Sequence, residues 1–500
     1  MAKDYMIIRG GRLLDLETRA APFQDILVAD GRIIQVGNPG LDAPATAEAI
    51  DAAGLLRHPG LVKAHTHGMF NLCKGMSDRS SLELLLVNAP AMIAQHSAEM
   101  KHLSTYLGAV EMLMKGCTAC CDLTFGFPFA TIDEMVAIGQ AYIDAGMRAV
   151  VAPSLADRSF YKAIPGLLDH IPSSLKAATA QHGSSSPHDG IRMMGQLLRD
   201  WPHERDRVSL GIAPVIPLHC SDGLMTDCAD LAREYAVVLH SHVAESKVQA
   251  VSSLTAYGNT MTAHLDSLGL LGPNFTVAHG VWLDDDDMRR LADNGSSVAH
   301  CAGSNMRLGC GIADARRMIE LGVNLAIGTD SANCSDNQNM YEAMRYASMA
   351  SNVRGPDYRR WLSSPEIIRA ATQGGAYALG FGDIGKIAPG YRADIVFIDL
   401  NSTNWMPLND PANQLVLAED GTGPKHVIVN GAFVVKDRRH RSCNLEDLSV
   451  RVEAARERLM ELTLPARNVG AALEKIVGDF CIGLARRHYH IERYAAPLGQ

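Results

Sequence analysis

The sequence predicts an α/β protein built on a (β/α)8 barrel of the TIM type, with a small β-sandwich and a helical C-terminal tail added to it. Short apolar runs alternate with longer stretches of helical periodicity over residues 59–384, which is the pattern of repeated βα units. Eight such runs can be counted, and eight is the number of strands that this barrel needs. The runs end at His65, Leu123, Ala152, Pro214, His242, His279, His300 and Asp330.

The barrel is expected to span residues 59–384. The ends of the first and last runs lie 265 residues apart, which fits the ~250 residues of a typical barrel with modest insertions. One insertion is visible as a stretch from Pro153 to about Arg207, which we expect to be rich in loops.

Two β-rich blocks flank the barrel, at residues 1–58 and 385–442. Each block contains two apolar runs joined by a two-residue turn that favours a hairpin, Asp30-Gly31 in the first block and Asn430-Gly431 in the second. Because the two blocks share this pattern, we expect them to form one sandwich from both ends of the chain.

Residues 443–500 are expected to form a helical tail. The segments DLSVRVEAARERLMEL and GAALEKIVGDFCIGLARR carry apolar residues at helical spacing. We expect this tail to make contacts between subunits of a homo-oligomer, with a homodimer as the simplest case.

Composition is that of an ordinary globular enzyme, with 47% hydrophobic and 20% charged residues among 500. The formal net charge of −9 comes without a basic block, so nucleic acid is not an expected partner. Because no window approaches the ~20 apolar residues that span a bilayer and no export signal is visible, a cytoplasmic location is expected. The eleven cysteines are then expected to be reduced, and Cys117, Cys120 and Cys121, in an apolar stretch, to be structural.

Histidine and aspartate side chains stand at the carboxyl ends of several runs, where barrel enzymes place their active sites. His65 and His67 have the same strand parity, so both imidazoles point into the barrel mouth. His242, His279 and Asp330 end three further runs. Any one of these residues has a structural explanation, but all five in register predict a metal site.

Two residues near the fifth run extend this prediction. Glu245 follows His242 by three positions, where a carboxylate can lean over the metal. His240 has the same parity as His242 and is a rival ligand lower in the barrel. Imidazole and carboxylate ligands favour Zn²⁺, and Fe²⁺ accepts the same ligand types.

The ordered motifs HPGLVKAHTHG, SHVAES, VAHGVWL, VAHCAGSN and GVNLAIGTDSA resemble those of the amidohydrolase superfamily. The resemblance is to its branch of aminohydrolases and chlorohydrolases, which includes adenosine-type, guanine and cytosine deaminases and the s-triazine hydrolases. It extends to about residue 440, with GKIAPGYRADIVFID similar to the closing segment of a urease-like sandwich.

The resemblance implies a role for each site residue. His65, His67, His242 and Asp330 would bind one metal ion, while Glu245 and His279 would face the attacking water and the substrate, with Asp330 also accepting a proton. Relatives with two metals use a carboxylated Lys or an acidic residue on the fourth strand, and SLGIAPVIP offers neither, so one metal is expected.

The implied reaction is hydrolytic deamination of an amino-substituted N-heterocycle, such as a pterin, purine base, pyrimidine or triazine, with release of ammonia. Displacement of halide, thioether or alkylamine from such a ring, or hydrolysis of a urea or amide, is the alternative. A non-catalytic barrel that serves as a scaffold is disfavoured because every expected site residue is present. No nucleotide-binding glycine motif is found, so no organic cofactor is expected.

Two segments depart from the pattern of this branch. The fourth-strand segment APVIPLHCS carries Val215 where adenosine-type and guanine deaminases usually carry His or Arg, which disfavours a purine nucleoside. His219, four residues later, is either a substitute or a structural histidine. The seventh-strand motif carries Ala302-Gly303, and we interpret His300, Ser304 and Asn305 as architectural rather than catalytic.

Substrate specificity is expected to lie in the loops after the first three strands, where aromatic rings and cations suit a flat ring. The strongest candidates for substrate contacts are Phe70, Lys74 and Arg158, together with His219. The other candidates are Asn71, Phe125, Phe127, Phe129, Phe160 and Tyr161, although scattered Phe residues are more often simple packing.

Overall fold

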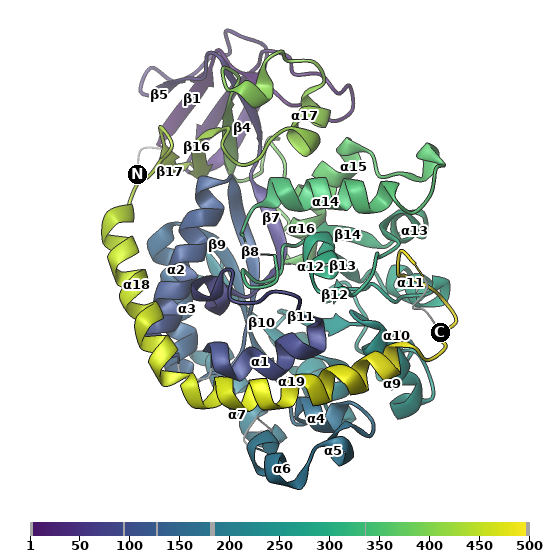
Figure 1. Ribbon diagram of the computed structural model, residues 1–500. Coiled ribbons are helices and arrows are strands. Elements are labelled where there is room, and N and C mark those ends of the chain that lie inside the picture. Colours follow the sequence, from purple (N-terminus) through teal and green to yellow (C-terminus); the bar gives the residue numbers. More distant parts are fainter. Residues whose placement is uncertain (1–3, 94–95, 127–128, 181–185, 336, 497–500) are drawn as a thin grey trace.

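The computed structural model describes residues 4–93, 96–126, 129–180, 186–335 and 337–496. At its centre is an eight-stranded parallel sheet, in which each strand pairs with the next one along the chain (Figure 1). The eight predicted runs are these eight strands. They are β7 (Leu61–Thr66), β8 (Cys117–Thr124), β9 (Arg148–Leu155), β10 (Val208–Pro214), β11 (Val238–Val243), β12 (Phe275–His279), β13 (Ser297–His300) and β14 (Asn324–Ile327).

The sheet curves until its two ends meet. The backbone N–H of Asp330, just after β14, donates to the carbonyl of His65 on β7 at 3.2 Å. Gly328 makes this approach feasible, because a Cβ there would stand 3.0 Å from the Cβ of His65 and 2.8 Å from the Sγ of Cys301. The first and last strands therefore bring their carboxyl ends to the same place.

Helices surround the barrel and cover the outer face of its strands, while side chains of the strands themselves fill much of the interior. All residues of β7, β8 and β9 are buried. The helices that follow the strands are α1 (Leu82–Ile93), α2 (Ala98–Met114), α3 (Ile132–Ala145), α8 (Asp222–Glu234), α9 (Lys247–Tyr257), α10 (Met261–Ser267), α11 (Asp285–Asp293), α12 (Ala302–Arg307), α13 (Ala315–Glu320), α14 (Met340–Asn352), α15 (Ser364–Arg369) and α16 (Gly375–Ala378).

Strands from both ends of the chain form a β-sandwich above the barrel (Figure 1). One sheet has the order β4-β3-β1-β5, and the other has the order β18-β17-β16-β15-β6-β2, so that β6 from the N-terminal block pairs with β15 from the C-terminal block. The strands are β1 (Tyr5–Arg9), β2 (Arg12–Leu13), β3 (Asp25–Ala29), β4 (Arg32–Gly37), β5 (Glu48–Asp51), β6 (Leu55–Pro59), β15 (Ile395–Asp399), β16 (Pro424–Val429), β17 (Ala432–Lys436) and β18 (Arg439–His440), with α17 (Pro411–Leu417) between β15 and β16.

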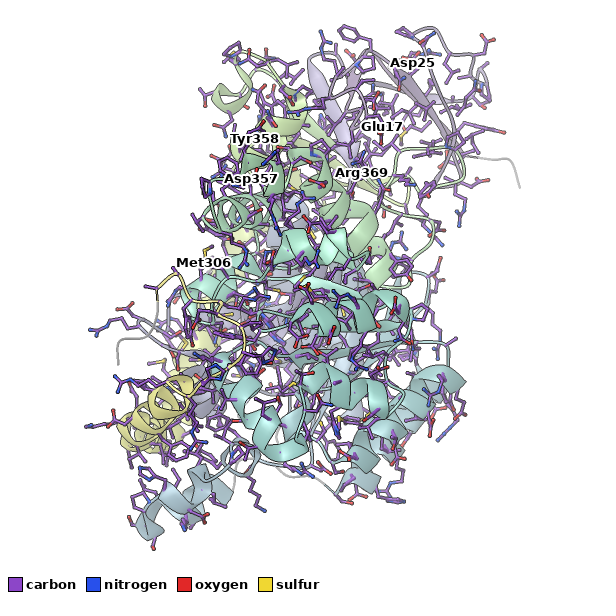
Figure 2. All side chains as sticks on the ribbon, turned by 90° about the vertical axis from the view of Figure 1, so that its right-hand side faces the viewer. Glu17, Asp25, Met306, Asp357, Tyr358 and Arg369 are labelled. Atoms are coloured by element: carbon purple, nitrogen blue, oxygen red, sulfur yellow. The ribbon has the colours of Figure 1, made fainter. Side chains whose placement is uncertain are left out.

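Both predicted hairpin turns are present in this sandwich. Asp30 and Gly31 join β3 to β4 with φ angles of 50° and 75°, and Asn430 and Gly431 join β16 to β17 with φ angles of 51° and 80°. Two consecutive positive φ values match the twist of a tight hairpin. The sandwich also contacts the barrel at its surface, where Arg369 of α15 pairs with Glu17 (Figure 2).

The insertion after β9 is helical, so the expectation of a loop-rich stretch is wrong. It contains α4 (Phe160–Ala163), α5 (Leu167–His170), α6 (Ser173–Ala180) and α7 (Pro187–Asp200). Pro165, Gly166 and Pro172 divide its first part into helices of one or two turns. Such short segments carry too few residues for their apolar spacing to be recognised.

The C-terminal tail forms two long helices, α18 (Leu445–Leu462) and α19 (Leu464–Ala485). In Figure 1, α19 runs across the barrel beside α1. Leu473, Val477 and Cys481 of α19 are buried in a cluster with Val87 of α1 and with residues of α4, α5 and α9. This face of α19 is therefore used within the chain.

Among the described helices, none combines the length and the apolar character needed to cross a membrane. All eleven cysteines are unpaired, and Cys117, Cys120 and Cys121 are buried in β8.

Candidate metal centre and substrate pocket

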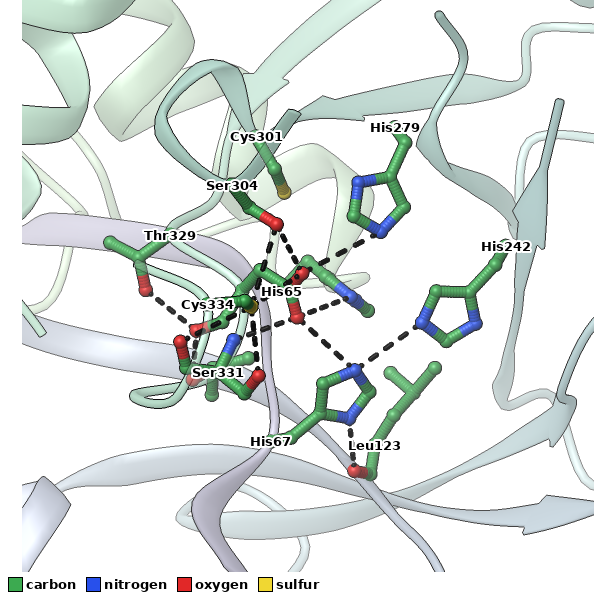
Figure 3. Close-up of polar contacts among 12 residues, drawn as sticks. His65, His67, Leu123, His242, His279, Cys301, Ser304, Thr329, Ser331 and Cys334 are labelled. Atoms are coloured by element: carbon green, nitrogen blue, oxygen red, sulfur yellow. Dashed lines mark hydrogen bonds and ion pairs between the residues drawn. The ribbon is translucent and has the colours of Figure 1, made fainter. Parts of the chain in front are cut away.

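The five residues predicted to form a metal site come together at the carboxyl ends of the barrel strands (Figure 3). His65 and His67 lie at the end of β7, His242 on β11, His279 at the end of β12 and Asp330 just after β14. Two overlapping groups have ligand atoms within 4.8 Å of one another, and His65 belongs to both. The groups are His65, His67 and His242, and His65, His279 and Asp330.

The histidine rings present bare nitrogen atoms to one another. The Nδ1 of His67 donates to the carbonyl of Leu123 at 2.7 Å, and the Nδ1 of His242 donates to the carbonyl of Val215 at 2.6 Å. With Nδ1 protonated, each neutral ring turns an Nε2 lone pair inwards, and these two Nε2 atoms are 3.3 Å apart. Both ring nitrogens of His65 are buried without a hydrogen-bond partner. Converging lone pairs of this kind fit a cation.

Asp330 completes the donor set. Its Oδ1 lies 3.3 Å from the Nε2 of His67 and 3.7 Å from the Nε2 of His65. Its Oδ2 accepts from the hydroxyl of Ser304 at 2.6 Å and from the thiol of Cys334 at 3.1 Å. Burial tends to raise the pKa of this carboxyl, but the neighbouring histidines and the two hydrogen bonds outweigh burial and hold the pKa at about 2.

Glu245 and His279 face each other beside these donors. The Oε1 of Glu245 is 3.6 Å from the Nε2 of His279, and both side chains are buried. Burial raises the pKa of Glu245 well above its usual range, and the carboxylates of Asp330 and Glu83 raise it further. The Nδ1 of His279 is bonded to the Oδ1 of Asn305 at 2.9 Å, while its Nε2 has no partner.

His240, the rival ligand, lies outside both groups of close donor atoms. Its ring stacks on that of His65 with centroids 5.0 Å apart, and its Nδ1 is 3.7 Å from the Sγ of Cys121. The Nε2 of His240 is buried without a partner.

A pocket of about 150 Å³ opens onto the centre. His67, His242, Glu245, His279 and Asp330 contribute to its inner end. Of the residues expected to contact substrate, it is lined by Phe70, Phe125, Arg158, Phe160, Tyr161 and His219. Asn71 and Phe129 do not line it, and Phe127 lies outside the described residues.

Lys74 does not line the pocket either. Its ammonium group forms an ion pair with Glu111 of α2 and lies at the protein surface.

Sequence reasoning missed residues that hold the site residues in place. Ser304 and Asn305 were interpreted as architectural, and the structure shows that they bond directly to Asp330 and His279. Cys334 was not identified, and neither was Glu83, whose Oε1 accepts from Ser246 beside Glu245 at 2.7 Å. Their positions in the sequence carry no signal, because each acts through a partner that only the fold brings close.

The profile of the amidohydrolase family matches residues 58–434. The chain is 30% identical over 460 residues to 5-methylthioadenosine/S-adenosylhomocysteine deaminase of Syntrophobacter fumaroxidans, covering 90% of this chain and 97% of that protein.

Solved structures of similar fold include an adenosine deaminase from Xanthomonas campestris with bound zinc, at a TM-score of 0.80 and 27% identity. The match covers 91% of this chain and 98% of that chain. An atrazine chlorohydrolase from Arthrobacter aurescens in complex with zinc has a TM-score of 0.81 at 24% identity, covering 90% and 100% of the two chains. At this lower identity the second likeness shows the fold alone.

Proposed function

Because this chain belongs to the amidohydrolase family, we propose that it deaminates an amino-substituted N-heterocycle by hydrolysis at a single zinc ion. The observation that carries the proposal is the buried carboxyl of Glu245, 3.6 Å from His279 and next to the converging donors at the inner end of the pocket. A proton-carrying group beside a metal-ligand set is the arrangement that water attack on a ring carbon requires.

The metal would be held by His65, His67, His242 and Asp330. Unpartnered imidazole nitrogens and one carboxylate suit Zn²⁺, although Fe²⁺ accepts the same ligands. When bound, the metal would lower the pKa of a water molecule from about 15.7 to roughly 7, so that hydroxide is available at neutral pH. A single ion is proposed because β10, the fourth barrel strand, contains neither lysine nor an acidic residue.

Glu245 would move the protons of the reaction. As a carboxylate it would take a proton from the attacking water, and its raised pKa favours keeping that proton until it is delivered to a ring nitrogen. Asp330, with a pKa of about 2, stays ionised and can accept the second proton transiently.

His279 would contact the oxygen that develops at the attacked carbon. Its position is fixed by the bond between its Nδ1 and Asn305, and by a left-handed backbone with φ of 71°. A group held in place before the reaction stabilises developing charge without having to reorganise. The amino group then leaves as ammonia.

The substrate is a small heterocycle, and a deaminase name on the relatives supports an amino group as the leaving group. Similarity to enzymes named for adenine nucleosides makes an adenine-type ring one candidate. Val215 stands in the pocket wall, however, so the polar group usual in adenosine-type enzymes is absent from that position. Pterins, oxopurines, pyrimidines and triazines therefore stay in the candidate set.

The proposal is tested by measuring ammonia release from zinc-loaded protein with a panel of pterins, purine bases, adenine nucleosides, pyrimidines and triazines. We expect turnover of at least one ring class, and a loss of at least about 100-fold in kcat when Glu245 is replaced by Gln. Absence of ammonia from every compound, or an active Glu245→Gln variant, would contradict the proposal.

We also propose domain boundaries and an oligomeric state for the chain. Residues 1–58 and 385–442 would form the sandwich, 59–384 the barrel and 443–500 the tail, which is supported by the ends of β6 at Pro59 and β18 at His440. A homodimer in the cytoplasm is proposed from the sequence, and light scattering of the purified protein would test the dimer.

A further inference from the structure

The pocket differs sharply between its two ends. Among the residues that line it, the carboxylates Glu245 and Asp330 are confined to the metal end. Much of the remaining wall is apolar, with Leu82, Leu85 and Ile93 of α1 among its members. A sugar presents hydroxyl donors that need acceptors, and no carboxylate in the lining away from the metal is placed to accept from them.

Arg158 is the cation in this lining. It follows β9, is exposed, lines the pocket, and forms no ion pair with any residue that the structure describes. Its backbone N–H donates to the carbonyl of His219 at 2.9 Å, and the N–H of Asp157 donates to the same carbonyl at 3.2 Å. The backbone therefore ties the loop after β9 to the loop after β10, and the two side chains share one pocket.

His219 is the second polar group on this side. The residue is 9% exposed and lines the pocket, and its ring has no hydrogen bond to the described part of the chain. Burial lowers the pKa of His219 to about 4, so the ring is neutral at pH 7 and offers one N–H donor and one acceptor. A neutral imidazole and an unpaired guanidinium that line the same pocket are matched by a ring carbonyl and its neighbouring ring N–H.

We propose that Arg158 and His219 form a recognition subsite for a ring carbonyl, so that the preferred substrate is an oxo-substituted amino heterocycle rather than a nucleoside. This inference rests on the proposed deamination, because it assumes that the amino-bearing carbon occupies the metal end. Arg158 donates to the carbonyl oxygen, and His219 pairs with the lactam edge. The apolar wall of α1 covers the faces of the flat ring.

The test compares ligands that differ only in the oxo group. Dissociation constants are measured by calorimetry on zinc-loaded Glu245→Gln protein, with isocytosine against 2-aminopyrimidine and with guanine against 2-aminopurine. A hydrogen bond to a charged group predicts that the oxo compound of each pair binds at least about tenfold more tightly. Arg158→Met should reduce this advantage to within about twofold while the oxo-free compounds bind unchanged.

Two further variants separate recognition from structure. His219→Leu keeps the backbone carbonyl that bonds Arg158, and it should also weaken the oxo preference. Arg192→Met removes an equal charge from α7, outside the pocket lining, and should leave all four constants unchanged. Equal binding of oxo and oxo-free compounds, or equal weakening of both by Arg158→Met, would overturn the subsite. If the oxo compounds bind more tightly but the wild-type protein releases no ammonia, the proposed deamination is contradicted and the recognition subsite is not.

Discussion

Residues that do not themselves face the metal orient three of the histidines in the candidate metal centre. His67 and His242 are oriented by backbone carbonyls of β8 and of the segment after β10, and His279 by Asn305. These partners fix which nitrogen carries the proton and therefore which one faces the metal. The sequence predicts the histidines from strand parity, but it does not reveal the partners, which come from other strands.

Replacement of His67 by Ala is expected to abolish metal binding. The change removes one of the two Nε2 atoms that stand 3.3 Å apart and leaves a gap beside the Oδ1 of Asp330. Metal content, measured by mass spectrometry of the purified protein, should fall from about one ion per chain to almost none. His240→Gln is the matched control, because this buried histidine lies outside the donor groups. Retention of metal by His67→Ala, or its loss from His240→Gln, would contradict this ligand assignment.

Replacement of Ser304 by Ala is expected to lower kcat without loss of the fold. Ser304 donates to the Oδ2 of Asp330 at 2.6 Å, and this bond leaves the Oδ1 directed towards the histidines. Removing such a partner typically costs 10–100-fold in metal affinity or activity, so we expect a decrease of about 30-fold in kcat. Ser304→Cys, which can still approach Asp330, should restore part of the rate. An unchanged kcat in Ser304→Ala would show that two other donors suffice to hold Asp330, the thiol of Cys334 and the backbone N–H of Ser331, which donates to the Oδ1 at 2.7 Å.

At the scale of elements, local signals decide what the sequence can predict. The eight barrel strands are short apolar runs, and the two hairpins carry dipeptides whose positive φ angles only a few residues accept. The helices α4 and α5 of the insertion escape prediction because each has four residues, which is too few to show a period. The ion pair of Lys74 is not predictable either, since its partner Glu111 lies 37 residues away on another helix.

His58 on β6 is expected to make the joint between sandwich and barrel sensitive to acid. The ring is fully buried, with Nδ1 bonded to the carbonyl of Pro59 and Nε2 at 2.9 Å from the hydroxyl of Tyr341 on α14. Burial lowers the pKa of His58 from 6.5 to about 4. Because the folded pKa is below the unfolded one, the stabilisation is fully present above pH 6.5 and is lost as the pH falls towards 4. The loss for this residue should reach about 2 kcal/mol at pH 5.

The contribution of His58 is isolated by comparison with a side chain that does not titrate. The free energy of unfolding in urea is measured at pH 7 and pH 5 for the wild type and for His58→Gln. The variant should be less stable at pH 7, because it disturbs the bond to Tyr341, but it should lose about 2 kcal/mol less on acidification. If both proteins lose the same free energy of unfolding between pH 7 and pH 5, other buried histidines cause the acid sensitivity.

At the scale of the whole molecule, the C-terminal helix α19 packs behind one wall of the pocket. α1 supplies a wall of the pocket with one face, and Val87 and its neighbours on the other face pack against α19. The approach is close, since a Cβ at Gly470 of α19 would stand 2.3 Å from the Oδ1 of Asn88 on α1. The contact joins segments almost 400 residues apart, so the sequence predicts the helical tail but not its packing against α1.

Leu473→Ala is therefore expected to affect both stability and substrate binding. Leu473 is fully buried between α19 and its neighbours, so truncation should reduce the free energy of unfolding by about 3 kcal/mol. Because α1 then loses part of its support, KM for the best amino heterocycle should rise several-fold while metal content stays constant. Ile482→Ala, on the same helix but 54% exposed, should change stability by less than about 0.5 kcal/mol and leave KM unchanged. If Leu473→Ala lowers the free energy of unfolding but leaves KM unchanged, α19 supports the fold without shaping the pocket. If only Ile482→Ala changes stability or KM, the exposed face of α19 makes the important contacts instead.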